Sequence, residues 1–186
     1  MRVIAGTARG RRLKSPQDDS ARPTTDRVRE AVFNALFSLG AIEDAVVLDL
    51  FAGSGALAIE ALSRGAKRAV LVEKSSRHTE LIKENLTLCD FDEQAEVHRA
   101  DAFTWLSTHQ ETWDLAFLDP PYDFDDWEKL LKNVKANLLV LESNREIDPG
   151  PQWDVLRSRR YGATVVVVAA AGSPENNVQK EGSLVS

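Results

Sequence analysis

Short apolar runs alternate with amphipathic stretches along most of the chain, and this alternation predicts an α/β fold. The apolar runs have the length of buried strands, and they end at Leu50, Glu73, Arg99, Leu118 and Glu142. Between them, apolar residues recur at helical spacing, which predicts helices over 24–39 and 125–134 and helices that end at 64, 88 and 108. Strands that alternate with helices in this way form a parallel sheet with helices on both faces.

The pattern changes after the fifth strand. Two prolines and a glycine at 148–151 interrupt it, because proline has no N–H group to donate to a strand or helix. Two further strands are expected over 155–159 and 164–169, joined by a short turn at 161–163, so the last strand runs antiparallel to its neighbour. The prediction is a Rossmann-like, seven-stranded, mostly parallel sheet with an antiparallel last strand, formed by residues 21–170. Residues 171–186 are small and polar and are expected to be a disordered tail.

A glycine-rich turn follows the first strand and precedes a helix. Strand, glycine turn and helix together open a nucleotide-binding βαβ unit, in which Gly53 and Gly55 let the backbone approach a ligand. The segment also satisfies the dinucleotide pattern G-x-G-x-x-A. Glu73, about twenty residues on, would hold ribose hydroxyls of either a nicotinamide cofactor or S-adenosylmethionine. The plain alternative for Glu73 is a solvated residue at a strand end.

Two aspartates favour S-adenosylmethionine over a nicotinamide cofactor. Asp49 ends the first strand, and its carboxylate suits an amino group and a sulfonium better than a pyrophosphate. Asp101 follows the third strand and could accept a hydrogen bond from an adenine amino group, with Phe103 against the adenine face. Each has a structural alternative: Asp49 could start a turn, and Asp101 could cap the next helix, a role compatible with adenine binding.

The fourth strand ends in Asp119-Pro120-Pro121-Tyr122, the most informative stretch of the chain. Neither proline can continue the sheet, so the strand gives way to a stiff loop that holds a carboxylate, carbonyl groups and a ring together. Oxygen acceptors beside an aromatic ring suit a planar base that carries an exocyclic amino group. An ordinary proline-rich turn is the alternative, and the glycine turn about seventy residues upstream favours the base-binding loop.

Composition indicates a soluble enzyme of one domain. The 186 residues can bury a sizeable core, and 43% of them are hydrophobic. Cys89 is the only cysteine, which excludes an intramolecular disulfide and favours a reducing, cytoplasmic compartment. We expect no signal peptide and no transmembrane segment. His78, His98 and His109 lie too far apart for a metal site, so no metal is expected.

Basic residues concentrate at the N-terminus of an otherwise acidic chain. The net charge is −6, whereas residues 1–30 alone carry +4, which leaves −10 for the rest. Residues 3–6 and 10–13 predict a β-hairpin with a basic tip, and residues 1–20 are expected to form this extension. A local basic patch on an acidic body still attracts phosphate, so RNA contact is favoured over a merely solvated hairpin.

Four segments together resemble the RsmD-type family of 16S ribosomal RNA guanine-N2 methyltransferases, which are class I methyltransferases. The resemblance runs from Arg2 to about Val168. Its segments are Arg2-Val3-Ile4-Ala5-Gly6 with Arg9-Gly10-Arg11; Arg22-Pro23-Thr24-Thr25-Asp26-Arg27-Val28-Arg29-Glu30-Ala31-Val32-Phe33-Asn34; 49–55; and 119–122. The last two would suggest only an amino methyltransferase, and the first two make the match specific.

The resemblance implies a role for each candidate residue. The cofactor-binding residues would be Asp49, Phe51, Ala52, Gly53, Gly55, Glu73, Lys74, Asp101, Ala102 and Phe103. The target base would lie against Asp119, Pro120, Pro121 and Tyr122, and RNA would contact Arg9, Arg11, Arg12 and Arg22. The implied partner is ribosomal RNA or an assembling small subunit, bound by a monomer.

Three other functions share part of this pattern. A DNA amino methyltransferase has the same loop but usually needs a target-recognition domain, for which the chain has no room beyond the hairpin. A protein-glutamine methyltransferase would favour Asn at the position of Asp119. A non-enzymatic RNA-binding assembly factor would not need both the glycine turn and the proline loop, and a dehydrogenase leaves that loop unexplained.

Overall fold

A single mixed β-sheet organises the chain. The computed structural model describes residues 1–16 and 26–172. The strands are β1 (Val46–Leu50), β2 (Arg68–Glu73), β3 (Ala95–Arg99), β4 (Trp113–Leu118), β5 (Ala136–Ser143), β6 (Trp153–Tyr161) and β7 (Thr164–Ala171). The helices are α1 (Asp26–Ser38), α2 (Ala56–Ser63), α3 (Ser76–Cys89), α4 (Ala102–Thr108) and α5 (Trp127–Asn133), with a 3-10 turn at Asp92–Gln94.

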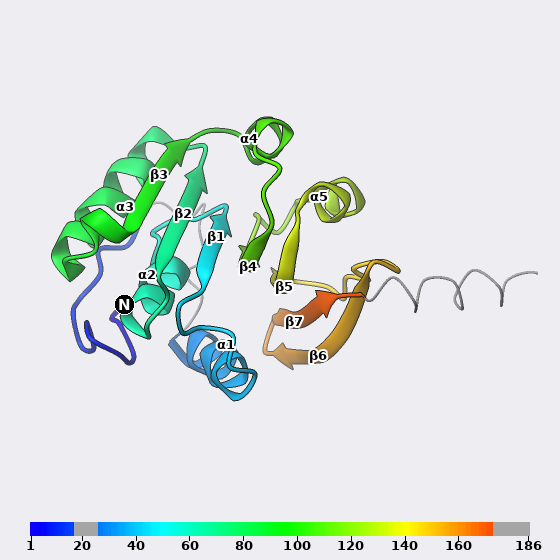
Figure 1. The fold of residues 1–186 in the computed structure, drawn as a ribbon, viewed down its shortest axis with the longest axis horizontal. Coiled ribbons are helices and arrows are strands. Elements are labelled where there is room, and N and C mark those ends of the chain that lie inside the picture. The colour runs from blue at the N-terminus through cyan, green and yellow to red at the C-terminus, as the bar shows by residue number, and fades with distance from the viewer. Residues whose placement is uncertain (17–25, 173–186) are drawn as a thin grey trace, which may run out of the picture.

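The strands lie in the order β3-β2-β1-β4-β5-β7-β6 (Figure 1). The first five are parallel, and β7 inserts antiparallel between β5 and β6. The seven strands and the antiparallel last strand predicted from the sequence are therefore confirmed. The order reverses between β1 and β4, and in open α/β sheets ligands bind at such a point, outside the carboxyl ends of the strands.

Two hydrophobic cores cover the two faces of the sheet. On one face, side chains of α1, α2 and α3 such as Phe33, Ile59 and Ile82 pack against the strands. On the other face, α4 and α5 contribute Trp105 and Leu130. Successive strand residues point to opposite faces, so a strand covered on both sides is apolar at nearly every position, as the run at β1 is.

The C-terminal hairpin is longer than the sequence pattern indicated. Its ladder extends from the pair Trp153↔Ala171 to the pair Tyr161↔Thr164, so Tyr161 belongs to β6 and only residues 162–163 form the turn. Gly162 has a φ of 62°, a left-handed conformation that suits a tight turn. Ala171 belongs to β7, and most of the expected tail, residues 173–186, lies outside the described residues.

The N-terminal hairpin has the predicted path but a much shorter ladder. Arg2 and Arg12 form a single antiparallel bridge, and Val3 N donates to Arg11 O at 3.0 Å. Residues 4–8 leave the ladder because their N–H groups bond to α2 instead: Thr7 N donates to Ser63 O at 2.7 Å. A Cβ added to Gly6 would lie 1.7 Å from that same carbonyl oxygen, so only glycine fits there. The hairpin is thus docked on the domain.

Candidate active site at the carboxyl edge of the sheet

A cleft of about 1270 Å³ opens at the carboxyl ends of β1, β2 and β4. All the cofactor residues expected from the sequence line it except Gly55, and so do the four residues 119–122. Pockets for one drug-sized ligand measure roughly 300–1,000 Å³, so this cleft has room for a cofactor and part of a second substrate. Segments seventy residues apart in the sequence therefore meet in one site, as the order of β1 and β4 predicts.

The two glycines of the turn have different roles. Gly53 has a φ of 57°, and a Cβ placed there would meet only Phe51 O, at 3.9 Å, so its α-carbon faces open space. Gly55 has a φ of 76°, and a Cβ there would lie 3.2 Å from Leu71 Cδ2 and 3.4 Å from Ile82 Cγ2. Gly55 is the N-cap of α2 and allows close packing of this helix on the core, whereas Gly53 borders the cleft.

Asp49 is almost fully buried at the end of β1. Its Oδ2 accepts a hydrogen bond from Ala58 N at 3.2 Å, within the first turn of α2. Burial raises the pKa of Asp49 to about 8. The hydrogen bond from Ala58 N opposes part of this rise, and the nearby carboxylates of Asp119 and Glu73 add smaller increases. Near pH 7 the carboxyl is therefore mostly neutral, and a cationic ligand group would favour its ionised form.

Glu73 braces the glycine turn. Its Oε2 accepts from Gly53 N at 2.9 Å and its Oε1 from Ser75 N at 2.8 Å, and its side chain is 11% exposed. The alternative of a solvated residue at a strand end is therefore wrong. A carboxylate has about four lone-pair sites, so Glu73 can hold these two N–H groups and still accept from ligand hydroxyls.

Asp101 caps α4 as its structural alternative predicted. Its Oδ1 accepts from Phe103 N at 3.1 Å and from Thr104 N at 3.3 Å, while Oδ2 lies 3.6 Å from Lys74 Nζ. Phe103 stacks on Phe124, with ring centroids 6.1 Å apart. The cap fixes Asp101 at the cleft rim, where Oδ2 is available to a ligand.

An aromatic wall closes the cleft on this side. Phe51 packs edge-on against Phe124, with ring centroids 5.4 Å apart. Phe51 also has a φ of 64°, which a bulky residue adopts at a cost of about 1–3 kcal/mol and which is characteristic of functional sites. Phe51 and Phe103 were predicted from the sequence as site residues, but Phe124 was not, because its position depends on the turn that follows 119–122.

The loop at 119–122 is held by the strands around it. Phe124 N donates to Pro121 O at 2.9 Å, which closes a turn, and Asn144 Nδ2 donates to Tyr122 O at 3.4 Å. Tyr122 Oη lies 3.3 Å from Thr164 Oγ1, at the start of β7. Asp119 lies beside Asp49 across the paired ends of β4 and β1. The loop thus places a carboxylate and a phenol ring on the same cleft.

The β6–β7 turn forms the wall of the cleft beside the proline loop. Because β7 runs antiparallel, the turn that precedes it lies at the carboxyl edge of the sheet. The cleft lining there consists of Arg160, Tyr161, Gly162, Ala163 and Thr164. These residues were not predicted from the sequence as site residues, although the predicted antiparallel hairpin was a signal that could have located them.

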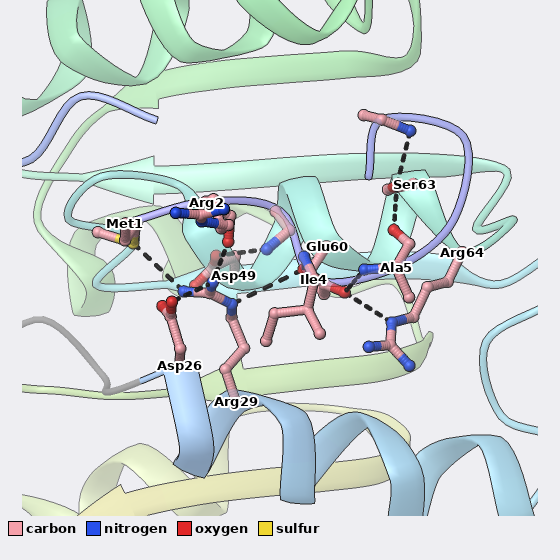
Figure 2. Close-up of polar contacts among 12 residues, drawn as sticks. Met1, Arg2, Ile4, Ala5, Asp26, Arg29, Asp49, Glu60, Ser63 and Arg64 are labelled. Carbon is pink, nitrogen blue, oxygen red and sulfur yellow. Dashed lines mark hydrogen bonds and ion pairs between the residues drawn. The ribbon is translucent and has the colours of Figure 1, made fainter. Parts of the chain in front are cut away.

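A buried ion-pair network fastens the N-terminal segment to α1 and α2 (Figure 2). Glu60 accepts from Ile4 N at 2.8 Å and from Ala5 N at 3.0 Å. The same carboxylate binds Arg64 Nε at 2.7 Å and lies 3.7 Å from Arg29 Nε. Arg29 also donates to Arg2 O, and Glu60 and Arg29 are both fully buried. The family-specific segments around residues 2–6 and 26–34 therefore meet in one network.

This network places the N-terminal segment at the rim of the cleft. Met1, Pro16, Arg27 and Val28 are part of its lining. Asn85, which is fully buried, strengthens the link, because its Nδ2 donates both to Ser54 O at 2.9 Å and to Lys14 O at 3.0 Å. In the sequence, Asn85 and Glu60 each stand among the apolar residues of a helix, and a polar residue in such a position indicates a buried polar contact.

Three of the four arginines expected to contact RNA, Arg9, Arg11 and Arg12, lie away from the cleft. Arg11 Nη1 donates to Leu88 O at 2.7 Å and lies 2.6 Å from Asp90 Oδ2, at the end of α3 that points to the amino edge of the sheet. Arg9 and Arg12 are exposed, and neither lines the cleft. Arg22 lies outside the described residues. Their contact with RNA stays a prediction.

Two kinds of feature were not found in the described part of the chain. Residues 1–16 and 26–172 contain no group of three or more His, Cys, Asp or Glu side chains that could hold a metal ion. Within the same ranges, no helix is long and apolar enough to cross a membrane.

Comparisons with known proteins agree with this geometry. The model of a family described as Conserved hypothetical protein 95 matches residues 1–170. The chain is 42% identical to ribosomal RNA small subunit methyltransferase D of Escherichia coli K12 over 174 residues, which cover 87% of this chain and 85% of that protein. The protein of the same name from Haemophilus influenzae is 37% identical over 174 residues, 87% of this chain and 89% of its own length.

A solved structure extends the likeness to three dimensions. The Escherichia coli protein yhhF superposes with a TM-score of 0.81 at 34% identity, and the match covers 93% of this chain and 98% of that one. The matched residues include the docked N-terminal segment, the glycine turn and the proline loop. The chain therefore belongs to the Conserved hypothetical protein 95 family, an RsmD-type family, and has the class I methyltransferase fold.

Proposed function

We propose that the protein transfers a methyl group from S-adenosylmethionine to the exocyclic N2 amino group of a guanine in small-subunit ribosomal RNA. The observation that carries the proposal is that the turn at 49–53 and the loop at 119–122 open into one cleft with room for two ligands. The names of the relatives, ribosomal RNA small subunit methyltransferases D, support the substrate class. Ribosomal RNA as substrate implies action in the compartment where small subunits assemble.

One part of the cleft, the cofactor half, is lined by Asp49, residues 51–53, Glu73, Lys74 and residues 101–103. Its residues fit S-adenosylmethionine. A cationic ligand group beside the buried Asp49 would favour the ionised carboxylate and pair with it, whereas a pyrophosphate would favour the neutral form and gain no ion pair. Glu73 would hold ribose hydroxyls, and Asp101 an adenine amino group, with Phe103 against the ring. When bound, the cofactor supplies a methyl group on a sulfonium, which is an excellent leaving group.

The residues of the loop would activate the amino group of the base. Its lone pair is delocalised into the guanine ring, and hydrogen bonds to Asp119 and to the Pro120 carbonyl would localise the pair and direct it at the methyl carbon. A new N–C bond would form as the C–S bond breaks, with the bonding pair left on sulfur, and a proton would leave the nitrogen for Asp119 or for water. The amine becomes acidic as it is alkylated, so no strong base is required. Positioning and electrostatics supply most of the acceleration.

The base must leave its stack to reach this site. Enzymes that act on a base extrude it into a pocket and replace the lost stacking with aromatic side chains. Tyr122 is half-buried at the cleft and is held near Thr164, so its ring would stack on the extruded guanine.

The deciding experiment maps the methylated nucleoside. The protein is incubated with methyl-labelled S-adenosylmethionine and either in vitro transcribed small-subunit RNA or undermethylated small subunits, and the digested RNA is separated into nucleosides. We expect the label in N2-methylguanosine. Label in N6-methyladenosine, in a methylcytosine or in protein would contradict the substrate assignment. Comparing the two substrates decides between naked RNA and an assembled particle.

A further inference from the structure

The edge strand β6 carries three exposed arginines that the proposed mechanism does not use. Arg157, Arg159 and Arg160, the β6 arginine row, lie within the last five residues of the strand. In the described part of the chain, arginine ion pairs with carboxylates involve Arg11, Arg29, Arg64, Arg68 and Arg145, so the row has no such partner there. Asp154 is the only acidic residue on the same strand.

Pairing with β7 holds the row on a firm support. Arg157 pairs with Val168, Arg159 with Val166 and Arg160 with Val165, and these three valines are buried. Val166 and Val168 belong to the core beneath α1, so Arg157 and Arg159 lie on that face of the sheet. Val165 belongs to the opposite core, which places Arg160 on the other face. The row therefore presents positive charge on both sides of the sheet edge.

The β6 arginine row adjoins the target half of the cleft, which is the part lined by residues 119–124 and 160–164. Arg160 and Tyr161 line the cleft, and the turn that follows ends at Thr164, which lies against Tyr122. Figure 1 shows β6 and β7 as the outer strands at the end of the sheet farthest from β3. The N-terminal arginine Arg11 contacts the end of α3, near β3, so the two basic regions lie at opposite ends of the sheet.

Protection of a bare sheet edge does not explain this distribution. Charged residues commonly prevent an edge strand from pairing with another chain. That role would place charge along the whole edge, yet Val155 and Leu156 are 50% and 49% exposed in the first half of β6. The arginines cluster instead in the half that reaches the cleft.

We propose that the β6 arginine row binds the phosphates of the RNA segment that flanks the target nucleotide. This inference rests on the proposed function, because the row adjoins the half of the cleft assigned to the base. Arginine is suited to phosphate, since its planar guanidinium donates two parallel hydrogen bonds. The net charge of −6 leaves little general attraction for RNA, so local cationic groups must supply it.

The test neutralises the row and measures RNA binding as a function of salt. The triple variant Arg157→Gln, Arg159→Gln, Arg160→Gln is titrated with in vitro transcribed small-subunit RNA at several salt concentrations, without any methyl transfer. Each phosphate contact to a single strand contributes about 0.7 to the slope of log K against log salt, so loss of three contacts lowers the slope by about 2. We expect affinity at 0.1 M salt to fall by roughly tenfold or more. S-adenosylmethionine binding, measured by calorimetry, should stay at the wild-type level.

A matched control removes the same charge from the amino ends of two strands, at the side of the sheet away from the cleft. Lys67, Arg68 and Lys135 are exposed at the amino ends of β2 and β5. Their triple glutamine variant should keep the wild-type slope. An equal fall of the slope in both variants would assign the effect to net charge and overturn the proposal. An unchanged slope in the β6 variant would overturn it as well.

A second variant separates charge from geometry. Lysine at all three positions keeps the charge but loses the bidentate fork, so we expect the wild-type slope with weaker affinity. Circular dichroism confirms that each variant is folded. Since binding is measured without turnover, failure of the wild type to methylate guanine would refute the proposed function alone, whereas an unaltered salt slope refutes the row alone.

Discussion

The cofactor half and the target half of the cleft are built in different ways. In the cofactor half, the carboxylates of Asp49, Glu73 and Asp101 each accept hydrogen bonds from backbone N–H groups of the turns and helices around them. In the target half, Tyr122 is held through its hydroxyl and carbonyl groups by the side chains of Thr164 and Asn144. The backbone contacts fix the acceptor groups of the cofactor half before a ligand binds. The ring of Tyr122 is held by two longer side-chain contacts, which can give way when a base binds.

Each half of the cleft also contains an ionisable side chain that a ligand could meet. In the cofactor half, burial raises the pKa of Asp49 to about 8, and the carboxylates of Asp119 and Glu73 add to the rise. The target half ends at Arg160 on the rim. Arg160 can attract a polyanion at this rim, whereas the buried carboxyl of Asp49 can pair with a cationic small molecule. Substitutions in the two halves should separate cofactor binding from RNA binding.

The largest effect is expected from Gly53→Val in the cofactor half. Gly53 has a φ of 57°, where a β-branched residue is strained, and the new side chain would project into the space that the cofactor needs. We expect calorimetry to detect no binding of S-adenosylmethionine. The control Gly40→Val introduces the same strain at a φ of 64° with open space around it, away from the cleft. That control should lower stability and leave cofactor affinity unchanged; tight NAD binding by the wild type would refute the cofactor assignment.

Asp119→Ala should cause the next largest loss, in turnover. Removing a single group that stabilises the reacting centre lowers kcat by roughly 10²–10³-fold. Asp119→Asn keeps an acceptor oxygen and should retain more activity than the alanine variant. Asp119 also adjoins Asp49, so cofactor affinity is measured in parallel to separate a loss of binding from a loss of chemistry. Near wild-type rates in Asp119→Ala would contradict the role of the loop.

The pH dependence of cofactor binding tests the role of Asp49 in the cofactor half directly. The pKa of Asp49 is raised from 3.8 to about 8, so the free protein must lose a proton before it can pair with a cation. Affinity for S-adenosylmethionine should rise by up to about tenfold per pH unit between pH 6 and 8. Asp49→Asn should bind more weakly, with an affinity that is independent of pH in this range. A flat profile in the wild type would contradict the link between Asp49 and the cofactor.

The same raised pKa predicts a pH-dependent stability. Between pH 3.8 and 8 the folded protein holds a proton on Asp49 that the unfolded chain has lost. Stability contributed by the neutral carboxyl is therefore fully present below pH 3.8 and is lost as pH rises through about 8. In chemical denaturation from pH 6 to 8, Asp49→Asn should lose less stability than the wild type.

Tyr122 tests the target half with a smaller effect. Tyr122→Ala removes the stacking surface, which contributes about 1–3 kcal/mol per base, so RNA affinity should fall by roughly 5- to 150-fold. Tyr122→Phe keeps the ring and removes only the 3.3 Å contact with Thr164 Oγ1, so it should bind RNA almost as well as the wild type. Equal losses in both variants would show that the hydroxyl, and not the ring, is responsible.

The sequence located more of the residues that line the cofactor half than of those that line the target half, and the reason is locality. The glycine turn and the acidic residues Asp49, Glu73 and Asp101 lie at or just after the ends of predicted strands. Hydrophobic periodicity predicts these strands, and it therefore locates the residues that follow them. The same spacing assigned Gly55 to the ligand, although its α-carbon faces Leu71 and Ile82 in the core. Spacing alone does not distinguish a glycine that admits a ligand from one that admits a side chain.

The missed residues depend on contacts between distant segments. Glu60 bonds to Ile4, 56 residues away, and no local pattern reports such a pair. The β6–β7 turn reaches the cleft only because β7 inserts between β5 and β6. The N-terminal arginines form a basic cluster that is visible in the sequence because Arg9, Arg11 and Arg12 lie within four residues, whereas the arginines of β6 gain their position from the topology of the sheet.

The smallest effect is expected from the N-terminal arginines. Arg9 and Arg12 are exposed and could each contact one phosphate, which would contribute about 0.7 to the salt slope. Arg11 already pairs with Asp90 at 2.6 Å and would exchange one partner for another, so Arg11→Gln should change the slope less than Arg9→Gln or Arg12→Gln. Cofactor affinity should not change in any of the three. The combined variant Arg9→Gln, Arg11→Gln, Arg12→Gln is compared with the β6 triple variant. If the salt slope fell by about 2 or more in the N-terminal variant and not at all in the β6 variant, the N-terminal hairpin would be the principal RNA contact.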